Sequence, residues 1–135
     1  MKKLFLIATS AVLLFASACK KSDPTPAAFD LSGSTYTGTA NVPGLSLTNR
    51  PFVLTFNADG TLSGSLTNGS AFLIAGTWNL APYATTVHLF FTLQTVSGSY
   101  VGSGTLTTSN TKIESGVATN ATMPSANLNF TVTKS

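Results

Sequence analysis

Residues 56–78 read FNADGTLSGSLTNGSAFLIAGTW, and this stretch decides the fold of the chain. Polar and apolar residues alternate with a period of two on both sides of two short turn sequences, as in half-buried antiparallel strands. The first turn, Asn57–Gly60, is typical of a three-residue hairpin loop with glycine in the left-handed position. It predicts a hairpin in which Phe56 lies opposite Leu62, so that large side chains share one face.

The second turn of this stretch, Asn68-Gly69-Ser70, extends the hairpin into a three-strand meander. A two-residue turn at Asn68-Gly69 would put Leu66 on the opposite face from Phe72 and Ile74. A three-residue loop, or an added bulge, restores one common apolar face. The sequence therefore predicts a departure from the simplest hairpin at this point.

The same alternation begins before this stretch and continues to the C-terminal end of the sequence, and no helical period interrupts it. We count eight strand-like runs: Ser34–Val42, Phe52–Asn57, Thr61–Thr67, Ala71–Leu80, Thr86–Val96, Tyr100–Thr107, Lys112–Thr119 and Asn127–Thr133. Sequential antiparallel strands with short loops predict an all-β fold, an eight-stranded antiparallel up-and-down barrel, because closure removes exposed sheet edges. A two-sheet β-sandwich is the alternative.

Two further connections give a predicted register for the middle of the sheet. A four-residue loop at Ala81–Ala84 would set Trp78 opposite Val87, and a two-residue turn at Ser97-Gly98 would close the next hairpin. In both pairings, bulky residues of one strand face glycines on a neighbour. Glycine repeated on one face suits a sheet that curls strongly enough to close, and the inward positions are Gly64, Gly76, Gly102 and Gly104.

Two motifs within residues 56–78 resemble a known family. The turn Phe56–Thr61 followed by Gly76-Thr77-Trp78 is similar to the lipocalin-like domains of many small bacterial lipoproteins. The resemblance implies a calycin-type antiparallel barrel. It also implies a carrier function, with a small apolar ligand held in the barrel interior.

The N-terminal stretch Met1–Cys19 has the three parts of an export signal. Lys2 and Lys3 supply positive charge, and the uncharged, mostly apolar run Leu4–Ala18 is too short to cross the roughly 30 Å hydrocarbon core of a bilayer as a helix. Small residues then lead into the only cysteine of the chain. Residues 1–18 are therefore predicted to be a cleaved signal peptide.

The end of that signal resembles a bacterial lipobox, in which a small residue precedes an invariant cysteine. The resemblance implies that Cys19 receives a diacylglyceryl group and, after cleavage, an acyl chain such as palmitate on its new amine. Residues 19–30 would be the lipidated cysteine and its tether, and residues 31–135 the barrel domain. The alternative is an ordinary secretory signal with cleavage after Ala18 and a free thiol. Lipidation implies attachment to the outer membrane of a Gram-negative cell.

Charge and composition exclude several classes of function. After Leu31, the basic residues Arg50, Lys112 and Lys134 face two acidic residues, so no basic patch for nucleic acid exists. The single histidine, His88, alternates with apolar neighbours and is predicted to face away from the core, opposite Thr77. No histidine or cysteine stands beside a nucleophile, and no carboxylates cluster. We therefore expect no catalytic residues, no metal site and no cofactor, and hence no enzyme.

Binding remains as the expected function, and two surfaces could serve it. The barrel interior could hold a small apolar ligand, and its lining would include Phe52, Phe56, Phe72, Trp78, Phe91 and Phe130. The outer wall could present an apolar interaction patch to a protein partner, and the residues predicted side by side there are Leu73, Ala75, Phe90 and Val101. A structural envelope or adhesin subunit would use the same outer patch.

Overall fold

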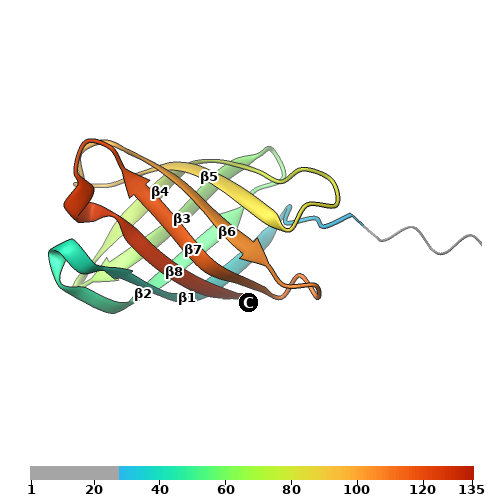
Figure 1. The fold of residues 1–135 in the computed structure, drawn as a ribbon, viewed down its shortest axis with the longest axis horizontal. Coiled ribbons are helices and arrows are strands. Elements are labelled where there is room, and N and C mark those ends of the chain that lie inside the picture. Colours follow the sequence, from blue (N-terminus) through green and yellow to red (C-terminus); the bar gives the residue numbers. More distant parts are fainter. Residues whose placement is uncertain (1–27) are drawn as a thin grey trace, which may run out of the picture.

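The computed structural model describes residues 28–135, which form one closed barrel of eight antiparallel strands (Figure 1). Each strand pairs with its neighbours in sequence, and β1 closes the barrel against β8. The strands are β1 (Ser34–Val42), β2 (Leu47–Phe56), β3 (Thr61–Asn68), β4 (Ser70–Asn79), β5 (Thr86–Leu93), β6 (Ser99–Leu106), β7 (Lys112–Asn120) and β8 (Leu128–Lys134). The up-and-down barrel is thus confirmed, and the β-sandwich alternative is wrong.

The barrel has two distinct ends (Figure 1). Residues 28–33 enter and the C-terminus leaves at the end that also carries the β2–β3, β4–β5 and β6–β7 loops, which we call the tether end. The distal end carries the other loops and two short 3₁₀ helices, η1 (Pro43–Leu45) and η2 (Pro124–Ala126). No helix within residues 28–135 is long and apolar enough to span a bilayer. The predicted signal peptide and Cys19 lie outside the described residues.

The register of β2, β3 and β4 is the predicted one. Phe56 pairs with Leu62 across the first hairpin, where Gly60 takes a φ of +84°. In the second hairpin Asn68 pairs with Ser70 around Gly69, so that Leu66 and Phe72 share one face. The departure from a two-residue turn is therefore confirmed.

The predicted registers of the next two hairpins are wrong. Trp78 pairs with Leu89 rather than Val87, because residues 80–85 form a longer loop in which Tyr83 has a φ of +64°. The β5–β6 connection spans residues 94–98 instead of Ser97-Gly98 alone. Both strands slip by an even number of residues, so every side chain keeps its predicted face.

A bulge in β7 separates two inward-facing sets. The β7–β8 register shifts between Ile113 and Gly116, and Ser115 adopts a φ of +49°. Ile113 faces the core before the bulge, whereas Gly116 and Ala118 face it afterwards. A bulge adds local twist and lets a curled strand follow the barrel wall.

The barrel core is built from the inward residues of all eight strands. Its largest fully buried side chains are Tyr36, Phe52, Leu54, Phe56, Leu62, Leu66, Leu89, Phe91, Tyr100, Ile113 and Leu128, together with Leu31 at the tether end. Inward glycines leave room for the aromatic rings. A Cβ on Gly116, for example, would lie about 2.4 Å from the Phe130 ring. Alternation of rings and glycines therefore allows the barrel to curl tightly around a packed interior.

The distal end is closed by a hydrogen-bond network around Asn120, which is 1% exposed. Its Nδ2 donates to the Ser97 carbonyl at 2.9 Å, and its Oδ1 accepts from the backbone N–H groups of Thr122 and Met123 at 3.0 and 2.9 Å. Its own N–H donates to Oδ1 of Asn127 at 2.7 Å. One buried amide thus joins the β5–β6 and β7–β8 loops with its polar groups satisfied.

Candidate interaction surface

The most exposed apolar side chains of strands β5, β6 and β7 lie together on the outer wall. Phe90 pairs directly with Val101 across β5 and β6, and the two are 52% and 62% exposed. Val117 on β7 pairs with Ser103, which places it diagonally beside Val101, and it is 46% exposed. Diagonal neighbours on one sheet face lie within reach of each other. We call Phe90, Val101 and Val117 the outer strip.

The corrected register changes the membership of the predicted outer patch. Ala75 pairs with Thr92, not with Phe90, which instead lies opposite Thr77. Leu73 is exposed, but it stands four residues farther along β4, about 13 Å from the Phe90 row at the strand rise. Phe90 and Val101 therefore belong to one surface, and Leu73 does not. Val117, which the sequence prediction left out, takes its place.

A shallow hollow of about 380 Å³ adjoins the outer strip. Its sides include His88 and Phe90 on β5 and Val101 on β6. Leu89 is buried with its side chain inward, so it contributes backbone to the floor. His88 faces outward as predicted, although its partner is Asn79 rather than Thr77. The hollow carries no carboxylate, lysine or arginine.

A second hollow of about 340 Å³ lies on the other side of Val117. It runs over β7, β8 and β1 and is lined mainly by hydroxyl and amide side chains, namely those of Thr39, Asn41, Ser115, Asn129 and Thr131. The outer strip thus forms an apolar ridge between two uncharged depressions. This arrangement offers apolar contact at the centre and hydrogen-bonding groups at the edge, as protein interfaces do.

The six aromatic residues predicted to line a ligand space are all turned toward the interior. Phe52, Phe56, Phe91 and Phe130 are buried, and Phe72 and Trp78 are partly buried against the same core. Their rings contact one another or other rings. Phe52 and Phe130 lie 5.2 Å apart between centroids, and Phe56 and Trp78 lie 5.6 Å apart. The rings therefore pack against each other across the barrel.

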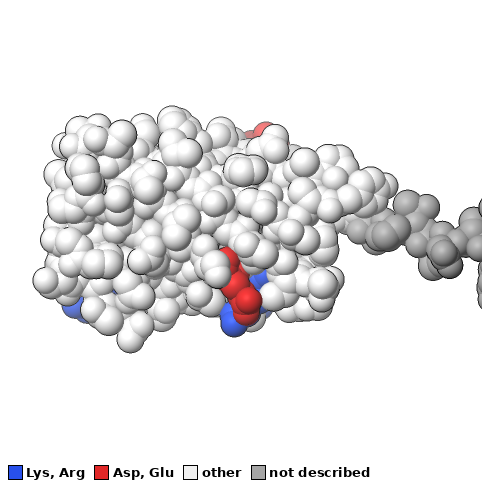
Figure 2. Space-filling model, viewed as in Figure 1, with Lys and Arg blue, Asp and Glu red and all other residues white. Residues whose placement is uncertain are grey.

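Formal charge gathers at the tether end. Asp30, Asp59, Lys112, Glu114 and Lys134 all lie in or beside its loops and termini, whereas Arg50 stands toward the distal end. Figure 2 shows an almost uncharged face over β6, β7 and β8, with one charged cluster toward the tether end. In the described residues, no three histidine, cysteine, aspartate or glutamate side chains are grouped to hold a metal ion.

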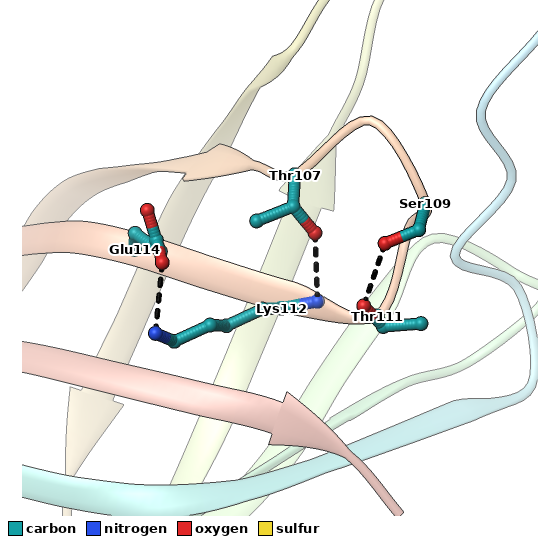
Figure 3. A network of polar contacts seen from close by, with 5 residues as sticks. All are labelled: Thr107, Ser109, Thr111, Lys112 and Glu114. Carbon is teal, nitrogen blue, oxygen red and sulfur yellow. Dashed lines mark hydrogen bonds and ion pairs between the residues drawn. The ribbon is translucent and has the colours of Figure 1, made fainter.

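The charged cluster at the tether end is part of a polar turn (Figure 3). Lys112 Nζ lies 2.8 Å from Glu114 Oε1, and the Lys112 backbone N–H donates to the Thr107 hydroxyl at 3.2 Å. Both charged side chains are about half exposed, so the ion pair stabilises the fold by about 0–1 kcal/mol. Glu114 pairs with Thr105, as predicted. These contacts shape a loop and leave no carboxylate pair for acid–base chemistry.

Asp59 is a turn residue, as its sequence context predicts. Its Oδ1 accepts hydrogen bonds from the Thr61 hydroxyl at 2.6 Å and from the Thr61 backbone N–H at 2.9 Å. These bonds stabilise the carboxylate and lower the pKa of Asp59 below its usual range. A carboxylate held ionised in this way fixes the β2–β3 turn.

Two buried tyrosines fasten the two ends of the barrel. At the tether end the Tyr36 hydroxyl donates to the Asn110 carbonyl at 2.8 Å, and at the distal end the Tyr100 hydroxyl donates to the Ala126 carbonyl at 3.1 Å. Burial raises the pKa of both phenols, because the phenolate would lose its hydration. For Tyr100 the Asn120 side chain offsets part of this rise in pKa.

These phenols predict an alkaline limit to stability. Unfolded tyrosine has a pKa of about 10, so above that pH the unfolded chain releases protons that the folded barrel retains. The free energy of unfolding in urea should therefore be constant with respect to these two groups below pH 9 and should fall as pH rises above about 10. In a Tyr36→Phe/Tyr100→Phe variant that fall should be much smaller. An unchanged alkaline slope in the variant would show that the two phenols ionise as freely in the barrel as in the unfolded chain.

Comparisons with family models, with curated proteins and with solved structures give no match for this chain. The lipocalin-like and lipobox resemblances therefore stay predictions from residues 56–78 and 1–19. What the structure itself brings together is a packed barrel, a charged tether end and an uncharged outer strip. Alternation along β7 past the bulge is the signal that could have identified Val117 in advance.

Proposed function

We propose that this protein is a lipid-anchored interaction module of the outer membrane, with a lipocalin-like barrel. Cys19 carries the lipid anchor, and the outer strip is the surface that binds a protein partner. The exposed Phe90–Val101 pair is the observation that carries the proposal. An aromatic residue and a β-branched residue, half or more exposed at the centre of an uncharged wall, suit the apolar core of an interface.

The packing of the barrel interior favours this function over a carrier. A carrier needs an interior space that its side chains leave free, as wider or emptier barrels do. Here Phe52 contacts Phe130, and Phe56 contacts both Tyr36 and Trp78. An apolar ligand would have to displace these ring contacts. A structural envelope or adhesin subunit would use the same outer strip, and it is a form of the same proposal.

Site-specific photo-cross-linking tests the proposed surface. A photoreactive phenylalanine analogue is placed at Val101 in the full chain, which is then expressed in a Gram-negative host and irradiated in intact cells. We expect a discrete protein adduct at Val101, because this residue stands at the centre of the outer strip. Mass spectrometry of the adduct identifies the partner.

Val53 provides a matched control for this experiment. It is also an outward valine, but it stands on β2, paired with Thr37 and Ser65 on the opposite wall of the barrel. The same analogue at Val53 should give no discrete adduct. Equal adducts at the two positions, or none at Val101, would mean that the outer strip is ordinary solvated surface.

A further inference from the structure

We propose that the partner of the outer strip is a second copy of this chain, related by a two-fold axis that runs along the barrel axis. The inference rests on the proposed function and names the partner of the same surface. Three observations carry it: the absence of formal charge around the strip, the hollow beside Phe90, and the position of the strip relative to the tether.

The charge pattern permits self-association. In an isologous interface, residues near the two-fold axis meet their own copies, so any charge there would face a like charge. The outward positions of β5 and β6 carry no formal charge when histidine is neutral; they are Thr86, His88, Phe90, Thr92, Ser99, Val101, Ser103 and Thr105. Two copies can therefore approach through this wall without electrostatic repulsion (Figure 2).

The shape of the surface is self-complementary. Phe90 projects from the wall with about half of its surface exposed, and the 380 Å³ hollow lies directly beside it. A two-fold operation about an axis near Val101 brings the Phe90 ring of one copy toward the hollow of the other. The same contact is then made twice, which is how a C₂ dimer gains from one small patch.

The tether determines the direction of the two-fold axis. Residue 28 enters at the tether end, and Cys19 precedes it by nine residues, which reach at most about 30 Å when fully extended. Ten-residue strands tilted by about 40° make a barrel about 25 Å long. An antiparallel pair would need one tether to run back along almost that whole length. A parallel pair places both tether ends toward one membrane.

The size of the strip indicates a weak contact that anchoring strengthens. Three strands by about five residues cover roughly 14 Å by 17 Å, which is less than the ~800 Å² per partner of a standard interface. Two anchored copies share a membrane and a common orientation, so their effective concentration is far above that in solution. The dimer is therefore a property of the anchored protein.

Cysteine cross-linking in the membrane tests the second copy. The chain has one cysteine, which is the predicted lipidation site, so an engineered thiol has no competitor. Full-length Val101→Cys is expressed in a Gram-negative host, and its membranes are treated with copper phenanthroline, with oxygen as the oxidant. We expect a disulfide-linked dimer on a non-reducing gel, and its loss in Val101→Cys/Phe90→Ser. Val53→Cys is the matched control and should stay monomeric.

The outcomes separate this inference from the proposed function. No dimer with Val101→Cys, or an equal dimer with Val53→Cys, overturns the second copy. If the Val101 photo-adduct contains another protein and the thiol dimer is missing, the interaction surface stands and its partner is different. If adduct and dimer are both missing, both proposals fail. Circular dichroism and thermal melting of the Phe90→Ser variant show whether its barrel is intact.

Discussion

Gly76→Val is expected to destabilise the barrel by about 3 kcal/mol or more, which exceeds the effect of most single substitutions. Gly76 lies on β4 opposite Phe91, with its missing side chain directed at the neighbouring strand. A Cβ there would lie 2.0 Å from the Phe90 carbonyl oxygen and 2.6 Å from the Phe91 Cα. Both atoms belong to the backbone, so no side-chain rotation relieves the overlap. Either β4 and β5 separate or the strand pairing shifts.

The measurement is thermal unfolding followed by circular dichroism, in which 3 kcal/mol lowers the Tm of a domain of this size by more than about 10 °C. Ala75→Val is the control, because it adds β-branched bulk to the adjacent residue, which is exposed on the outer face. Its Tm should change little, since surface substitutions away from special features have effects within about 0.5 kcal/mol. A Gly76→Val protein that melts like the Ala75→Val control would contradict the close approach of β4 and β5.

The inward and outward faces of the strands could be predicted because alternation is a local property. Phe56, Leu62 and Leu66 are separated by even numbers of residues across known turn chemistry, and all three are buried. An error in loop length did not change this result. The β4–β5 loop is two residues longer than predicted, and an even slip leaves each residue on its face. Fold class therefore survives errors that register does not.

Register could not be predicted where non-glycine residues adopt left-handed conformations. Tyr83 in the β4–β5 loop, Thr95 in the β5–β6 loop and Ser115 at the β7 bulge all have φ between +49° and +70°. Such conformations are uncommon outside glycine and asparagine, and nothing local in the sequence signals them. Tertiary contacts select them. Because the outer patch was assembled from register, it was predicted only in part.

The Asn120 network illustrates a second limit. The residues that bond to its side chain are Ser97, in the β5–β6 loop, and Thr122 and Met123, just after β7. From the sequence Asn120 is one more polar residue after a strand, and its burial follows only once the loops meet. Non-local polar pairing of this kind has no periodic signal. By contrast, the outward position of Phe90 followed from alternation alone.

Cys19→Ser is expected to move the protein completely from the membrane to the soluble fraction of the envelope. Each buried CH₂ of an acyl chain contributes about 0.8 kcal/mol, so two or three chains hold a protein durably, whereas one chain binds only reversibly. Serine offers no thiol for the diacylglyceryl group. Ala16-Ser17-Ala18 still provides small residues for cleavage by the ordinary secretory route, so the variant should be released with residue 19 at its N-terminus.

Three measurements on the same samples make this prediction decisive. Fractionation and immunoblotting locate the protein, labelling with an alkyne analogue of palmitate reports acylation, and intact-mass analysis shows whether residues 1–18 were removed. Ser22→Ala in the tether is the control and should stay acylated in the membrane. A cleaved, unlabelled Cys19→Ser protein that still sediments with membranes would show that the barrel itself binds the bilayer. Its uncharged outer wall, rather than the anchor, would then account for its location, and the parallel dimer would lose its geometric basis.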